Sequence, residues 1–123
     1  MNQHREVLQA IYDNFNARDI EGVLAALRPD VLWANGMDGG HEHGIDAVRA
    51  YWTRQWALVQ PTVKPVGFEA VGNDAVLVTV EQTVRDLDGK PLAGQDHGLH
   101  DKRVGHRFQF RDGKVARFDI TEL

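Results

Sequence analysis

Residues 104–120 have the sequence VGHRFQFRDGKVARFDI, in which two runs of alternating apolar and polar residues flank Asp112 and Gly113. An Asp-Gly pair between alternating runs is among the strongest short-range signals for a two-residue hairpin turn with positive φ at its centre. The stretch therefore predicts two paired antiparallel strands, and the rest of the chain is interpreted around this hairpin.

The turn sets the register of the hairpin, because a slip of one residue moves every side chain to the opposite face. A two-residue loop pairs Arg111 with Lys114 and, counting outward, places His106 directly opposite Asp119. Alternation then divides the hairpin into two faces, of which one has more apolar residues near the turn and the other has three cations. The first face consists of His106, Phe108, Phe110, Val115, Arg117 and Asp119; the second includes Phe118 and Ile120.

We expect the first face, with His106 and Asp119, to point inward. Arg117 argues against this choice: it must reach the mouth of a pocket or pair with Asp119, or else the choice of face is wrong. On this assignment Phe118 and Ile120 point outward.

Composition bounds the class of protein. The 123 residues suit one domain, and 42% hydrophobic with 26% charged residues is ordinary for a globular protein. A net charge of −4 with scattered cations gives no nucleic-acid footprint, and the lack of cysteine excludes disulfides, thiolate metal sites and a cysteine nucleophile. No run approaches the roughly 18 apolar residues of a membrane span, and no signal peptide is seen, so a cytoplasmic protein is expected.

Apolar residues at helical spacing predict three helices in the first half of the chain. The first helix covers about residues 3–17 and is marked by Val7, Leu8, Ile11 and Phe15. Asp19 is placed to cap a short second helix that Pro29 closes off. A third helix over residues 45–59 carries Trp52 and Trp56 one turn apart on its buried stripe.

Strand signals occupy most of the remainder. Residues 31–33 form a brief strand, after which a glycine-rich loop ends in His41-Glu42-His43-Gly44. Alternating strands follow at 66–71 and 76–84, and a second Asp-Gly turn at 88–89 leads into a loop rich in glycine and histidine, Ala93 to His100. Three helices followed by antiparallel strands predict a single α+β domain, 1–123, with a curved antiparallel sheet wrapped around the helices.

Five short motifs in this order resemble the SnoaL-like, ketosteroid-isomerase-like branch of the nuclear transport factor 2 fold. They are FNARD at 15–19, GIDAVR at 44–49, VRDLDG at 84–89, DKRVGH at 101–106 and FRDGKV at 110–115. The resemblance implies a cone-shaped α+β barrel, dimeric through its outer sheet face, whose interior binds small, largely apolar molecules without a cofactor. The fold hosts isomerases, cyclases, dehydratases, epoxide hydrolases and pure binding modules, so function must be argued from residues.

Residue by residue, the resemblance favours one of these chemistries. The positions of the steroid-isomerase tyrosine and two aspartates fall on Ile11, Asn35 and His106, so that machinery is missing. The cyclase-like pattern, an aspartate on the last strand with a histidine on the strand before it, matches Asp119 and His106. The Asp-Arg-Asp arrangement of the epoxide hydrolases has no clear counterpart.

Asp119 and His106 are therefore the candidate catalytic residues. A carboxylate in an apolar cone is desolvated, which raises its pKa and makes it a stronger base toward a proton next to a carbonyl. His106 would donate to the enolate oxygen or orient Asp119, with Asn35 or Gln82 as an additional neutral donor. The alternative is a cross-strand ion pair that needs no substrate.

Aromatic residues are the candidate pocket walls. Trp33, Trp52 and Trp56 line a pocket or form plain core, and core is expected for at least one of them. Phe108 helps to set the pocket volume. Tyr12 lies beside the stripe of the first helix, where its hydroxyl either reaches the pocket or, as we expect more, stays partly exposed.

Four histidines invite a metal hypothesis, because His-x-His in an extended segment places both rings on one side. They are His41, His43, His97 and His100. Nothing brings the second pair near the first, so no metal is expected, and the resemblance implies no cofactor.

Three functions remain open. The first is a cofactor-independent enzyme that acts on a small hydrophobic carbonyl compound by acid/base proton transfer, like a polyketide cyclase or an isomerase. The second is a non-catalytic module that holds a small ligand or a partner protein. The third is a cone filled by its own side chains, with Phe118 and Ile120 on an outer face that serves a homodimer.

Overall fold

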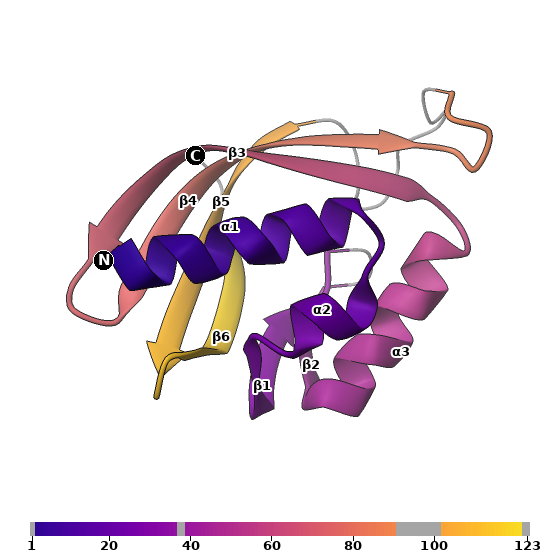
Figure 1. Ribbon diagram of the computed structural model, residues 1–123. Helices are drawn as coiled ribbons and strands as arrows, with labels where there is room; N and C mark the ends of the chain where they lie inside the picture. The colour runs from indigo at the N-terminus through magenta and orange to yellow at the C-terminus, as the bar shows by residue number, and fades with distance from the viewer. Residues whose placement is uncertain (1, 37–38, 91–101, 122–123) are drawn as a thin grey trace.

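The computed structural model describes residues 2–36, 39–90 and 102–121, which form three helices and six strands (Figure 1). In chain order the elements are α1 (Asn2–Asn16), α2 (Ile20–Leu24), β1 (Leu27–Ala34), β2 (His41–His43), α3 (Ile45–Trp56), β3 (Gln60–Val71), β4 (Ala75–Arg85), β5 (Lys102–Arg111) and β6 (Lys114–Thr121). Three helices packed against one curved sheet confirm the predicted α+β class.

The strands form one sheet in the order β2-β1-β6-β5-β4-β3. Neighbouring strands are antiparallel except β1 and β6, which run parallel, so the sheet is mixed where an antiparallel one was expected. The parallel pair joins the last strand, β6, to the early strand β1, and β6 lies between β1 and its hairpin partner β5. The β5-β6 hairpin therefore lies in the middle of the sheet.

The helices cover one side of the sheet (Figure 1). α1 packs against β3, and α3 packs against β1 and β2. Of the apolar stripe predicted for α1, Leu8 and Ile11 are buried in a core shared with the sheet residues Val78 and Val80. Val7 and Phe15 are partly buried against this core. Full burial of such a side chain contributes about 1.5–3 kcal/mol. None of the helices in the described residues is long and apolar enough to cross a membrane.

Several element boundaries differ from the sequence prediction. β1 begins at Leu27 and contains Pro29, and β3 begins at Gln60 and contains two prolines. β3 is an edge strand, where proline is tolerated because one side of its backbone needs no partner. α3 ends at Trp56, short of the predicted end, and part of the predicted glycine-rich loop forms β2. The predicted loop Ala93 to His100 lies outside the described residues.

The turn of the central hairpin is as predicted. Asp112 and Gly113 have φ angles of 55° and 81°, both in the left-handed region that this two-residue turn requires. Next to the turn, Arg111 pairs with Lys114 as expected.

Beyond the next pair the register shifts. Phe110 pairs with Val115, but Gln109 pairs with Arg117, so that Ala116 is an extra residue on β6. This is a β-bulge, which moves all later side chains of the strand to the opposite face. The shift turns Phe118 toward the core and turns the ionic side chains of Arg117 and Asp119 outward.

The predicted pairing of His106 with Asp119 is therefore wrong. His106 pairs with Ile120, and Asp119 pairs with Arg107. Phe118 is only 4% exposed and faces the core rather than the outer surface. The homodimer expected through the outer sheet face stays a prediction. Of the two residues offered for it, Phe118 is buried, and Ile120 is 36% exposed and lines the cavity on the inner side of the sheet.

Candidate active site

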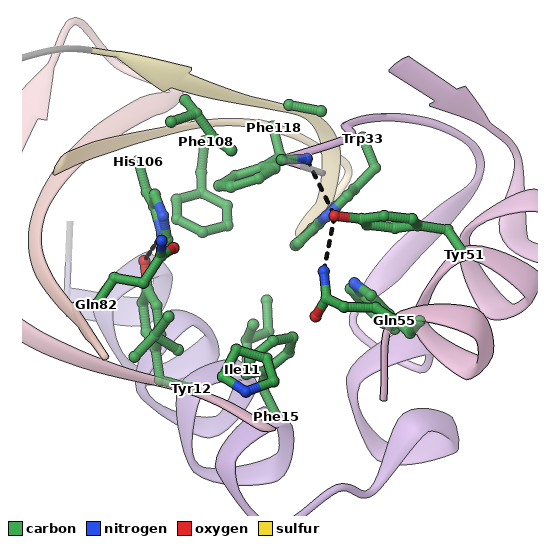
Figure 2. Close-up of a pocket in the computed structure, with 16 residues that line it drawn as sticks. Ile11, Tyr12, Phe15, Trp33, Tyr51, Gln55, Gln82, His106, Phe108 and Phe118 are labelled. Carbon is green, nitrogen blue, oxygen red and sulfur yellow. Dashed lines mark hydrogen bonds between the residues drawn. The ribbon is translucent and has the colours of Figure 1, made fainter. Parts of the chain in front are cut away.

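A cavity lies between the sheet and the helices, with an empty volume of about 530 Å³ that includes its open mouth (Figure 2). Its walls are mainly aromatic and aliphatic, and no Asp, Glu, Lys or Arg lines it among the described residues. The aromatic walls are Phe15, Trp33, Trp52, Phe108 and Phe118. In such surroundings hydrogen bonds are stronger than in water, and unpaired polar groups are costly.

Tyr12 and His106 form the first polar group of the cavity. The Tyr12 hydroxyl, from α1, lies 2.8 Å from Nδ1 of His106, from β5. Tyr12 is 3% exposed and His106 is 6% exposed. The ring of His106 also packs edge-on against Phe118, 4.8 Å away. The expectation that Tyr12 is partly exposed is wrong, because the helix turns this side chain toward the sheet.

The environment of Tyr12 keeps its hydroxyl protonated. Burial raises the pKa of Tyr12 well above the ordinary tyrosine value of 10.0. With the imidazole proton on Nδ1, the ring donates to the tyrosine oxygen and the hydroxyl proton is directed elsewhere; with it on Nε2, Nδ1 accepts the hydroxyl proton. The pair can therefore both donate and accept a proton at one place on the wall.

Tyr51 and Gln55 form a second polar group on the other side of the cavity (Figure 2). Both come from α3, four residues apart and hence on one face of the helix. The Tyr51 hydroxyl oxygen accepts hydrogen bonds from the Gly36 backbone N–H at 3.0 Å and from the Gln55 amide at 2.7 Å.

The Gln55 carbonyl oxygen has no hydrogen-bond partner, although Gln55 is only 2% exposed. An unpaired buried acceptor costs about 1–3 kcal/mol, and such an atom needs an explanation. Neither Tyr51 nor Gln55 was predicted from the sequence. The only signal was a polar residue at the spacing of a buried helical stripe.

The predicted pocket residues have different positions. Tyr12, Trp33, Trp52, Gln82, His106 and Phe108 line the cavity. Asn35 is buried between the lining residues Ala34 and Gly36 without lining the cavity itself. Trp56 is not a lining residue: it lies behind the wall, stacked on Trp52 at 6.0 Å, and is only partly buried against the core.

Asp119 does not line the cavity. Its carboxylate accepts hydrogen bonds from Arg117 at 2.7 Å and lies 2.7 Å from Nε2 of His41. The hydrogen bond from Arg117 lowers the pKa of Asp119, against the opposing effect of partial burial, and His41 lowers it further. A desolvated base with a raised pKa was expected here, and the bulge in β6 is the reason for the difference.

Of the four histidines of the metal hypothesis, the structure describes His41 and His43. Within the described residues, no group of three His, Cys, Asp or Glu side chains is arranged to hold a metal ion. His41 is engaged with Asp119, and His97 and His100 lie outside the described residues.

A curved sheet with three helices on one side and a cavity between them defines the nuclear transport factor 2-like class of α+β proteins. Within this class the chain belongs to the SnoaL-like domain family, which matches residues 8–118. A comparison with curated proteins finds no significant match.

Solved structures with the same fold support this placement. One is an NTF2-like protein of unknown function from Burkholderia pseudomallei, with 25% identity and a TM-score of 0.80 over 100% of this chain and 92% of that one. Another is TerC co-crystallized with polyporic acid, with 26% identity and a TM-score of 0.79 over 98% and 92%. A putative polyketide cyclase from Sinorhizobium meliloti shares 18% identity and a TM-score of 0.76 over 94% of each chain, and shows the fold alone.

Proposed function

We propose that the protein is a cofactor-independent enzyme that moves a proton next to the carbonyl group of a small hydrophobic compound, as a cyclase or an isomerase does. The observation that carries the proposal is the hydrogen-bonded Tyr12–His106 pair, buried in the wall of an otherwise apolar cavity. Membership of the SnoaL-like family and the likeness to TerC are consistent with it.

His106 is the acid/base of the reaction. In its neutral form it takes the proton from the carbon next to the carbonyl, and the C–H electron pair becomes the C=C bond of an enolate. The carbonyl oxygen gains the negative charge, and the protonated Tyr12 donates a hydrogen bond to it. His106 takes this role because no carboxylate lines the cavity in the described part of the chain.

The second half of the reaction returns the proton. In an isomerisation His106 protonates a different carbon of the enolate. In a cyclisation the enolate carbon attacks an electrophilic carbon of the same molecule, and His106 protonates the alkoxide that forms. Both routes restore the neutral histidine and need no oxidant or cofactor.

The test is the exchange of the hydrogens next to the carbonyl of 2-tetralone for deuterium, followed by NMR in D₂O. The wild-type protein is expected to accelerate this exchange, and His106→Gln to lower the catalysed rate by about 100-fold or more. The matched control is His43→Gln, which changes an exposed histidine away from the cavity and is expected to keep the wild-type rate. Equal rates in the His106→Gln variant and the wild type would contradict the role of His106.

A non-catalytic ligand-binding function is the second candidate. It is favoured by the absence of a carboxylate base from the described cavity wall. Saturable binding of 2-tetralone and related bicyclic ketones, with no exchange above the buffer rate for any of them, would select this function.

A further inference from the structure

The unpaired Gln55 carbonyl is the strongest feature of the cavity that the proposed reaction does not use. It lies on the side opposite the Tyr12–His106 pair (Figure 2). The other buried atom without a partner, Nε1 of Trp56, belongs to a residue behind the cavity wall. Gln55 is thus the one such side chain, within the described residues, that lines the cavity.

The orientation of the Gln55 amide follows from its neighbours. Its NH₂ group donates to the Tyr51 hydroxyl at 2.7 Å, and the backbone N–H of Gly36 donates to the same oxygen. In this orientation the NH₂ group is engaged with Tyr51, and the carbonyl oxygen is the buried atom of the amide that has no hydrogen-bond partner. The group that faces the ligand is therefore a hydrogen-bond acceptor.

We infer that Gln55 determines specificity by accepting a hydrogen bond from a hydroxyl group of the substrate. The cavity then has two polar ends with aromatic walls between them, and it selects a largely apolar carbonyl compound that also carries a hydroxyl group on the side away from its carbonyl. The Tyr51 and Gly36 hydrogen bonds hold the amide in place, so the acceptor is fixed before the ligand arrives. This inference rests on the proposed function only because it takes the cavity as the substrate site. It does not depend on the proposed proton transfer by His106.

The test measures binding only, with 2-naphthol and its methyl ether 2-methoxynaphthalene as probes. Both have the same rings, but the ether has no hydroxyl proton. Dissociation constants from calorimetry give the preference of each protein for the hydroxyl compound. That preference is expected to fall by about tenfold from the wild type to Gln55→Met, a variant of similar shape without an acceptor.

Two controls separate Gln55 from other causes. Gln55→Glu keeps an acceptor at the same place and is expected to keep the preference. His43→Gln changes an exposed histidine away from the cavity and is expected to leave the preference unchanged. An unchanged preference in Gln55→Met would overturn the inference.

A second measurement on the wild-type protein covers the case in which Gln55→Met does not fold. The side-chain carbonyl carbon of Gln55 is expected to shift in the NMR spectrum with 2-naphthol and not with the ether. Equal shifts with both probes would overturn the inference. Failure of the deuterium exchange with the hydroxyl preference intact would refute the proposed chemistry and leave the role of Gln55 standing.

Discussion

Tyr12 links α1 to β5, because its hydroxyl forms a hydrogen bond with the His106 ring. Its position beside the apolar stripe could be read from the sequence, but whether it pointed inward depended on how close α1 approaches β5. The same holds for Tyr51 and Gln55. Helical spacing places them on one face of α3, yet only the packing of α3 shows that this face meets a cavity.

Burial of Tyr12 predicts a specific dependence of stability on pH. Because burial raises its pKa in the folded protein, the folded state holds the proton more tightly than the unfolded state does. The contribution of Tyr12 to the free energy of unfolding is full below about pH 10 and is lost as the pH rises toward the folded-state pKa. Urea unfolding of wild type and Tyr12→Phe at pH values of about 8 and 11 measures it.

The expected result is a difference in free energy of unfolding between the two proteins that shrinks at the higher pH. At the lower pH Tyr12→Phe should be less stable by about 1–3 kcal/mol, because it leaves the buried Nδ1 of His106 without its partner. A difference that is constant or grows with pH would show that the hydroxyl is exposed to water in the folded protein.

At the scale of elements, the β5-β6 hairpin shows what the sequence could and could not predict. The Asp112-Gly113 turn and the first pairs next to it follow from local backbone preferences. The bulge at Ala116 does not, because it reflects a competition between burying Phe118 and burying Arg117 with Asp119. Desolvation of the ionic side chains is unfavourable. The presence of Arg117 on the predicted inner face was the one sequence observation that argued against that choice of face.

The bulge predicts what the substitution Asp119→Asn does. Because this carboxylate lies outside the cavity, the variant is expected to bind 2-tetralone with wild-type affinity. Loss of its ion pair with Arg117 and its hydrogen bond with His41 should reduce the free energy of unfolding at neutral pH by up to about 1 kcal/mol.

The sign of the pH effect is fixed by the lowered pKa of Asp119. The stabilisation is present above the unfolded-state pKa of about 4 and is lost as the pH falls through the folded-state value, so the difference between the proteins should vanish in acid. Calorimetry measures the affinity for 2-tetralone, and urea unfolding at neutral pH and in acid measures the stability difference between the two proteins. A large loss of ligand affinity in Asp119→Asn would instead favour the hairpin without a bulge.

For the whole molecule, the order of helices and strands was sufficient to predict the α+β class, and the resemblance carried by five short motifs predicted the family. The sequence did not predict the parallel pairing of β1 with β6. It also did not predict that polar groups lie on two opposite sides of the cavity. Both depend on contacts between segments far apart in the chain, as between Tyr12 and His106.

The pH dependence of the deuterium exchange of 2-tetralone tests most directly whether His106 is a neutral base beside a protonated Tyr12. After subtraction of the buffer rate, the wild-type rate should rise through a single ionisation and then stay level up to about pH 9.5, because Tyr12 keeps its proton throughout this range. His106→Gln should show no such rise. A wild-type rate that falls before about pH 9.5, or a His106→Gln variant with the wild-type profile, would contradict the account.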